Sequence, residues 1–149
     1  MNFRTAPWLV LLFLTSQPTL STELLAPADR ATLFKAVGLK QAHNEWIDGC
    51  GRQVTPKVEL ADLNRDGQPE VFLWVPGSCS GGAAGAELTL FVKRSGQWQA
   101  NLGFPAGGYK TLKTTNKGFP DLEIGGPGFC FPVWRWNGAK YELHRKCEK

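Results

Sequence analysis

The alternation of hydrophobic and polar positions predicts one short helix followed by a series of strands. Leu33, Phe34 and Val37 recur at helical spacing after Pro27, and Gly38 can end a helix in the left-handed conformation. Strands are predicted over 58–60, 71–75, 88–92, 98–102, 109–114, 122–124, 131–136 and 141–144. We therefore expect an α+β, mostly β fold, in which the N-terminal helix packs on a mainly antiparallel sheet of about seven or eight strands.

Three of these segments also carry an expectation about burial. The run 71–75 is continuously apolar, which is typical of a strand buried on both faces. Apolar and polar residues alternate in 58–60 and 88–92, so both are expected to be half-exposed. Ser95-Gly96 and Asn137-Gly138 are expected as hairpin turns, and the second favours a primed two-residue turn.

The first 21 residues resemble a secretory signal peptide. A positive residue, Arg4, precedes the apolar run 8–14, and Pro18 with small residues near Ser21 resembles a cleavage region. We expect a signal peptide over 1–21, a single domain over 22–149 and a periplasmic or secreted protein; a buried N-terminal helix is the alternative. No later run is long enough to predict a membrane span. The net charge of the chain, +4, is too small, and its lysines are too scattered along the sequence, to predict nucleic-acid binding.

Four cysteines, all after the predicted signal peptide, predict two disulfides. Of the three possible pairings we favour Cys50–Cys147 with Cys79–Cys130, because the first would tie the ends of the domain and the second would join two glycine-rich loops. A zinc site is not indicated, because no two cysteines are closely spaced.

The segment 62–70 has the spacing of a calcium loop. Asp62, Asn64, Asp66 and Glu70 place side-chain oxygens at positions 1, 3, 5 and 9 of the loop, Gln68 can add its backbone carbonyl, and glycine stands at position 6. An EF-hand would need Glu at position 12, which is Leu73, and flanking helices in place of strands. The alternative is a metal-free turn in which Asp62 and Asn64 accept hydrogen bonds from backbone amides.

The loop resembles the strand–loop–strand calcium loops of integrin-type propeller repeats, in a single copy. Together with the leader, the short helix and the segment 125–138, it makes the chain similar to small uncharacterised exported proteins of Proteobacteria. That resemblance implies a periplasmic location and brings no catalytic residues. A looser analogy links the chain to periplasmic immunity and inhibitor proteins of cell-wall hydrolases.

Candidate catalytic groups are few, and we predict that the chain is not an enzyme. Cys79 lies at the centre of a Gly-Ser-Cys-Ser-Gly segment that resembles a nucleophile elbow, with His43 or His144 as a possible base. In an exported chain such a cysteine is expected to be half of a disulfide. Asp121 and Glu123 share one strand face, as a glycosidase pair could, but solvent-facing carboxylates have the same pattern.

The aromatic segment near the C-terminus is the second functional candidate. Trp134 and Trp136 fall on one face of a predicted strand, with Arg135 on the other and Tyr141 on the next strand. These four residues could form a binding surface, or the tryptophans could belong to the core.

We expect a calcium-stabilised protein that occludes a periplasmic protein partner such as a cell-wall hydrolase; the alternative is a module that binds glycan or cell wall. The shape of the loops separates the two. An inhibitor would project 80–86 or 106–108 as a wedge, whereas a glycan binder would offer a groove with the exposed faces of Trp134 and Trp136.

Overall fold

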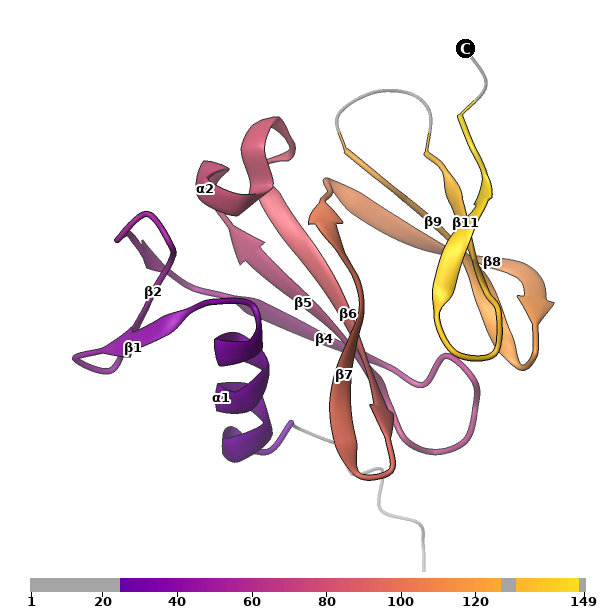
Figure 1. The fold of residues 1–149 in the computed structure, drawn as a ribbon, viewed down its shortest axis with the longest axis horizontal. Helices are drawn as coiled ribbons and strands as arrows, with labels where there is room; N and C mark the ends of the chain where they lie inside the picture. The colour runs from indigo at the N-terminus through magenta and orange to yellow at the C-terminus, as the bar shows by residue number, and fades with distance from the viewer. Residues whose placement is uncertain (1–24, 127–130, 148–149) are drawn as a thin grey trace, which may run out of the picture.

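A computed structural model of the chain describes residues 25–126 and 131–147 (Figure 1). The helical elements of this part are α1 (Pro27–Ala36), α2 (Ser78–Gly81) and the 3-10 helix η1 (Gly82–Ala84). Its strands are β1 (Lys40–Ala42), β2 (Glu45–Ile47), β3 (Gln53–Val54), β4 (Lys57–Ala61), β5 (Glu70–Pro76), β6 (Ala86–Arg94), β7 (Gln97–Pro105), β8 (Gly108–Asn116), β9 (Phe119–Gly125), β10 (Val133–Trp136) and β11 (Tyr141–Arg145). The predicted signal peptide lies outside the described residues.

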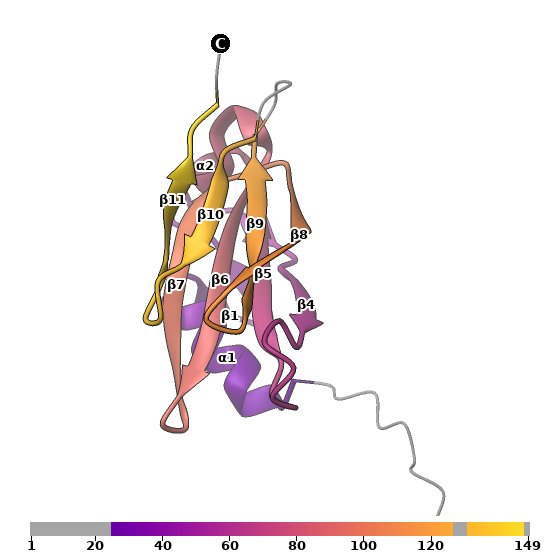
Figure 2. The same cartoon turned by 90° about the vertical axis from the view of Figure 1, so that its right-hand side faces the viewer.

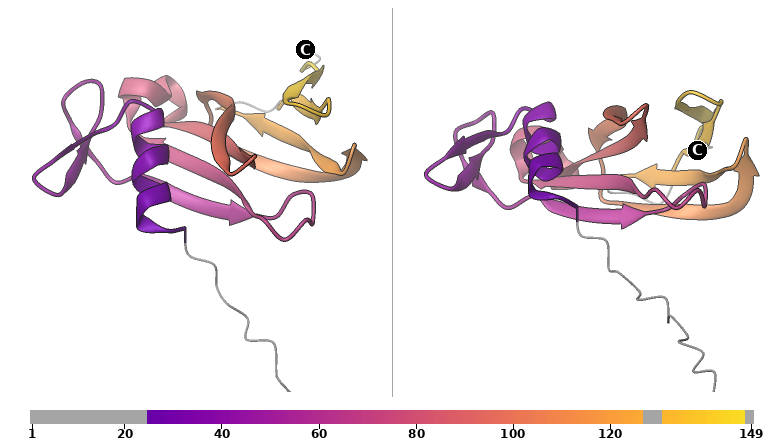
Figure 3. Two further views of the ribbon diagram at one scale, coloured as in Figure 1. Left: turned by 60° about the horizontal axis from the view of Figure 1, so that its bottom comes forward. Right: turned by 90° about the horizontal axis from the view of Figure 1, so that it is seen from below.

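The strands form three antiparallel sheets, which confirms the mostly β class but not the single sheet. The central sheet has the order β4-β5-β6-β7, the outer sheet β11-β10-β9-β8 and the small sheet β1-β2-β3. Figure 2 shows the central and outer sheets stacked face to face, and Figure 3 shows α1 on the opposite face of the central sheet. None of the described helices has the length and apolar character needed to cross a membrane.

Two hydrophobic cores lie on either side of the central sheet. Leu33 and Phe34 of α1 pack with Val71, Leu73 and Val75 of β5 in the first core. The second core lies between the two large sheets, and its buried members are Phe72, Leu88, Leu90, Val92, Leu102, Ala106, Phe119, Leu122, Ile124, Trp136 and Tyr141. Alternate residues of β5 therefore enter different cores, which is why 71–75 is apolar throughout and confirms its predicted burial on both faces.

Strand β6 corrects one expectation. Leu88, Leu90 and Val92 do share a face, but Phe91 on the other face is also buried, in the core beneath α1. The strand is therefore not half-exposed as predicted, because the helical layer covers the face that the alternation assigned to water. Strand β4, by contrast, is only partly buried, as expected.

The turns confirm one expectation and correct another. Ser95 and Gly96 both have positive φ, at 49° and 77°, as a primed turn requires. In the β10–β11 hairpin only Gly138 has positive φ, and the side chain of Asn137 accepts hydrogen bonds from the amides of Ala139 and Lys140. The Asn137 side chain thus stabilises a longer loop than the predicted two-residue turn.

Candidate functional site

The predicted calcium loop joins β4 to β5 and folds into a compact turn. Asp62 accepts hydrogen bonds from the amides of Asp66 and Gly67, at 3.1 and 3.0 Å. Asn64 Oδ1 also accepts from the Asp66 amide, at 3.1 Å, and Asp66 Oδ1 accepts from the Gln68 amide, at 2.8 Å. Every one of these acceptors is a predicted metal ligand, so the loop has the hydrogen bonds expected of the metal-free turn.

Glu70, the last predicted ligand, is buried at the start of β5 with 3% of its surface exposed. Its Oε2 accepts a hydrogen bond from the Leu63 amide at 2.8 Å. Burial is the main cause that raises the pKa of Glu70 to about 7; the Leu63 amide opposes this rise, and the Asp66 and Asp62 carboxylates add to it. The fold therefore holds a carboxyl group where its negative charge is costly, and a cation would lower that cost.

The oxygen ligands of the loop are of the type that calcium prefers, whereas their positions only partly match those of a calcium site. Each carboxylate oxygen that accepts one N–H retains a lone pair, and an all-oxygen set suits a hard cation. Among the described residues, the one trio of acidic, His or Cys side chains with donor atoms within 4.8 Å of one another is Asp48, Cys50 and Cys79. Asp62, Asp66 and Glu70 would have to draw closer together around an ion.

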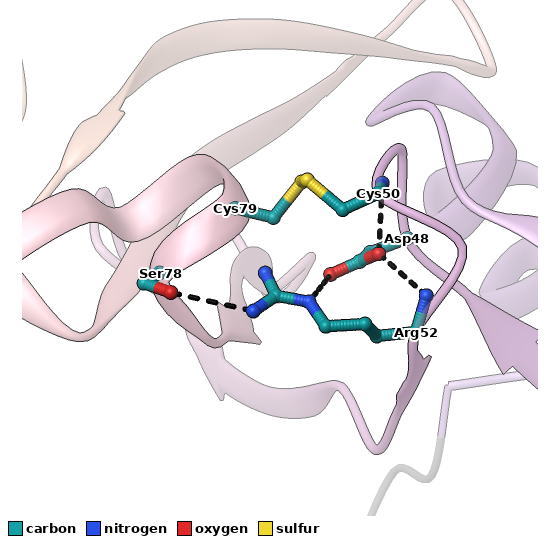
Figure 4. Close-up of a disulfide and its surroundings, with 5 residues drawn as sticks. All are labelled: Asp48, Cys50, Arg52, Ser78 and Cys79. Atoms are coloured by element: carbon teal, nitrogen blue, oxygen red, sulfur yellow. Dashed lines mark hydrogen bonds and ion pairs between the residues drawn. A yellow bond between two sulfur atoms is a disulfide. The ribbon is translucent and has the colours of Figure 1, made fainter.

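The trio of Asp48, Cys50 and Cys79 consists of the Cys50–Cys79 disulfide and the hydrogen-bonded carboxylate of Asp48 beside it (Figure 4). Asp48 accepts hydrogen bonds from the amides of Cys50 and Arg52, both at 2.9 Å, and from Arg52 Nε at 3.2 Å. The Arg52 amide is the largest of the contacts that hold the pKa of Asp48 below its usual value. Arg52 Nη1 donates to Ser78 Oγ at 3.3 Å, so the polar contact joins the same two segments as the disulfide.

This bond overturns both predicted pairings. Because Cys79 is bonded to Cys50, neither Cys50–Cys147 nor Cys79–Cys130 can form. Cys147 is disulfide-bonded as well, and Cys130 lies outside the described residues. The prediction assumed that the ends of the domain meet, whereas the loop before β3 lies beside α2. Cys79 is thereby unavailable as a nucleophile in the disulfide-bonded protein.

The predicted aromatic binding surface is also corrected. Trp136 and Tyr141 are only 3% and 2% exposed, because their faces of β10 and β11 close the core between the two large sheets. Tyr141 donates a hydrogen bond from its hydroxyl to the Pro120 carbonyl at 2.8 Å. Trp134 is partly buried and stacks on Phe104, with 5.1 Å between the ring centroids. These rings are packing residues, which was the alternative interpretation.

Arg135 lies on the opposite face of β10 and is held by Asp121 of β9. Its Nε and Nη2 donate to the two carboxylate oxygens at 2.9 and 2.6 Å, and Thr114 donates to the same carboxylate at 2.6 Å. The hydrogen bond from Arg135 is the main reason that the pKa of Asp121 is below its usual value. Asp121 is thus a buried structural partner of Arg135.

A groove not predicted from the sequence lies where the central and outer sheets are joined. Two cavities of about 450 and 530 Å³ share Ala84 and Gly107 in their walls. Tyr109, Lys110, Glu123 and Phe131 line the first, and Lys57, Glu59 and Trp74 line the second. We call the two cavities together the glycine groove, because Gly85, Gly107, Gly108 and Gly126 also form its walls.

Aromatic and charged groups are held in fixed positions along this groove. Tyr109 stacks on Phe72, with 3.9 Å between ring centroids, and donates its hydroxyl to Glu59 Oε2 at 3.2 Å. Burial, reinforced by Glu59, raises the pKa of Tyr109 to about 12, so the phenol keeps its proton. The other oxygen of Glu59 pairs with Lys57 Nζ at 2.7 Å. Phe131 is one of the two large hydrophobic residues exposed in the described part of the chain.

Of the two segments expected as wedges, 106–108 forms part of the groove wall, whereas 80–86 contributes only residues 84–86 to it and keeps Gly82 and Ala83 exposed. Ala106 is fully buried, and its amide donates to the Ala86 carbonyl at 3.0 Å. The Gly107 amide donates to the Gly125 carbonyl at 2.7 Å. The segment 106–108 is therefore hydrogen-bonded to both large sheets and does not project.

The two histidines lie away from the groove and from the disulfide. His43 occupies the β1–β2 turn with φ of 48°, and His144 is an exposed residue of β11. Gly107-Gly108 within strand-forming sequence was the one signal of the groove, but its meaning depends on backbone conformation, which the sequence does not show.

No protein family, curated protein or solved structure matches this chain, so its function has to be inferred from the geometry described above.

Proposed function

We propose that this chain is a calcium-stabilised, non-enzymatic binding protein of the periplasm or extracellular space, and that it binds its partner in the glycine groove. The observation that carries the proposal is the groove itself, with an exposed Phe131 at one end and hydrogen-bonded Tyr109 and Glu59 within it. A concave, partly apolar site with a few fixed polar groups is the usual form of a small-molecule or chain-binding site.

The groove and the predicted calcium loop lie at opposite ends of the sandwich. The β4–β5 loop joins Ala61 to Glu70 at one end of the β4–β5 pair (Figure 1), whereas Lys57 and Trp74, which line the groove, are partners at the other end. An ion in the loop would therefore act on the stability of the β4–β5 pair, and it would not contact a partner in the groove. Calcium is accordingly proposed as a structural ion.

The groove supports the glycan-binding alternative more than the wedge-shaped inhibitor. Of the two segments that an inhibitor would insert into a hydrolase, 106–108 is hydrogen-bonded to both large sheets, and 80–86 contributes residues 84–86 to the wall while Gly82 and Ala83 are exposed. An immunity-type protein that uses the groove would have to receive a loop of its partner there. The two disulfide-bonded cysteines of Figure 4 support an oxidising compartment for either form of the proposal.

The test compares the wild-type protein with two variants as bait for a periplasmic extract and for solubilised cell wall. Gly108→Leu fills the groove from a position where an added Cβ meets no atom within 4 Å. Leu143→Ala is the control, since Leu143 is 44% exposed and lies on β11 outside the groove. We expect wild type and Leu143→Ala to retain the same partner and Gly108→Leu to lose it, with all three melting alike. Retention by Gly108→Leu would contradict the proposal.

A further inference from the structure

We infer that the glycine groove binds an uncharged sugar chain. This inference rests on the proposed function and specifies the ligand of the same site. It draws on three independent features of the groove: glycines that the fold does not need, a neutral balance of charge, and an aromatic ring that is both exposed and firmly seated.

The glycines come first. Gly107, Gly108 and Gly126 do not adopt left-handed backbone conformations, so no positive φ requires glycine there. A Cβ at 107 or 126 would meet its nearest atoms at 3.8 and 3.6 Å, which is ordinary contact, and a Cβ at 108 would meet nothing within 4 Å. Neither conformation nor packing therefore explains three glycines in one wall. Because these three glycines have no side chains, they leave space in which a ligand can approach the backbone.

The charges come second. The first cavity contains one lysine and one glutamate, Lys110 and Glu123, which face each other as partners on β8 and β9. The second also contains one of each, Lys57 and Glu59, in an ion pair at 2.7 Å. Each cavity is thus neutral overall while offering both donors and acceptors. Such a site favours a polyhydroxylated, uncharged ligand over an acidic or basic peptide, a nucleic acid or an anionic lipid.

The ring of Phe131 comes third. It is 38% exposed, and it rests on Gly125, where an added Cβ would overlap the ring. Because Gly125 also lacks a positive φ, its glycine is explained by this ring. A fixed, exposed phenyl face offers a flat apolar platform with a negative quadrupole, to which the C–H face of a sugar ring is complementary. The cavities of about 450 and 530 Å³ are of the size that small-molecule sites have.

The experiment is a calorimetric titration of the intact protein with four-residue oligosaccharides. The neutral probes are the N-acetylglucosamine, cellulose-type and maltose-type tetramers; the charged probes are the glucosamine and galacturonate tetramers. We expect at least one neutral probe to bind, and both charged probes to bind at least about tenfold more weakly than that probe. Phe131→Ala and Gly108→Leu should each weaken the neutral probe by about tenfold or more, with Leu143→Ala unchanged.

The outcomes separate this inference from the proposed function. If no neutral probe binds at millimolar concentration, or if a charged probe binds best, the sugar inference is wrong. If the groove-filling variant nevertheless loses a partner captured by wild type, the groove is still the binding site and its ligand is of another class, such as a protein loop. If the probe binds but all variants bind it equally, the sugar site lies elsewhere and the inference is wrong. Nuclear magnetic resonance spectra recorded during the titration identify the backbone amides whose signals shift when the sugar binds, and this locates the site independently of the affinity.

Discussion

The ring of Phe131 lies against the backbone of Gly125, so closely that any side chain at position 125 would overlap it. Gly125 ends β9, and Phe131 precedes β10, so the contact sets the position of an exposed aromatic residue between two strands of the outer sheet.

The first prediction concerns this contact. Gly125→Ala should displace the Phe131 ring and destabilise the domain by about 1–3 kcal/mol, the usual cost of overpacking. Gly108→Ala is the matched control, because its Cβ meets no neighbour, and its stability should stay within about 0.5 kcal/mol of wild type. Urea unfolding of both variants measures the difference. Equal stability of the two variants would show that the ring is not seated on Gly125.

The second prediction concerns Trp136, which the sequence allowed either as a binding residue or as a core residue. Because it is buried in the core between the large sheets, Trp136→Ala should lower the free energy of unfolding by about 3–5 kcal/mol. Leu143→Ala, at a residue that is 44% exposed, should change it by no more than about 0.5 kcal/mol. A Trp136→Ala protein that unfolds like wild type would return Trp136 to the candidate binding surface.

The third prediction uses the ion pair of Asp121 and Arg135. The pKa of Asp121 is lowered in the folded protein, so the unfolded chain binds protons more readily than the folded one as the pH falls. The pair therefore stabilises the fold fully above the unfolded pKa of about 4 and loses this contribution at lower pH. Urea midpoints measured from neutral pH to about pH 2 should fall more steeply for wild type than for Asp121→Asn. Parallel curves would exclude Asp121 as a source of acid sensitivity.

The fourth prediction concerns Glu70 and calcium. In chelator, the folded pKa of about 7 exceeds that of the unfolded chain, so the folded state binds the extra proton between about pH 4.5 and 7. Stability in chelator should therefore decline as the pH rises through this range. Calcium needs the ionised carboxylate, so the stability it adds should grow over the same range; at about 100 times the dissociation constant it should reach about 2.7 kcal/mol.

Two variants give this prediction its controls. Glu70→Gln should remove the pH dependence in chelator, and Asp66→Ala should remove the gain from calcium while leaving most of the pH dependence. Melting curves at pH 5 and pH 8, with calcium or with chelator, provide the comparison. If wild type neither gains stability from millimolar calcium nor releases heat on titration with it, the loop is the metal-free turn.

The fifth prediction concerns the disulfide. Peptide mapping of the unreduced protein should find Cys50 linked to Cys79. Replacing both residues with serine should lower stability by about 3–4 kcal/mol on the loop-entropy model, given a sequence separation of 29 residues. A fragment joining Cys50 to Cys147 would contradict the structure and restore the pairing expected from sequence.

Local patterns in the sequence were sufficient for several elements. Helix α1, the doubly buried β5 and the hairpin turn at Ser95-Gly96 follow from spacing and turn chemistry that involve only neighbouring residues. The sequence also identified the loop 62–70 as a tight turn rich in oxygen ligands, because that property depends on a dozen consecutive residues. Whether the loop binds calcium or remains metal-free stays a prediction.

What the tertiary structure decided is which surfaces meet. The alternation of apolar and polar residues is compatible with one sheet and with two stacked sheets. Alternation shows that a strand face is apolar, but it does not show which element covers that face. Hence Trp136 and Tyr141 could be placed on a face but not assigned to the core, and Phe91 could not be assigned to the layer beneath α1.

The disulfide and the glycine groove depend on contacts between distant segments in the same way. Cys50 and Cys79 meet only because the loop before β3 lies against α2, and cysteine spacing alone does not contain that contact. The glycines at 107, 108 and 126 look like turn residues in the sequence, since a pair of glycines permits many backbone conformations. Only the fold shows that their backbone is ordinary and the space beside it open, because that space is bounded by side chains from both large sheets.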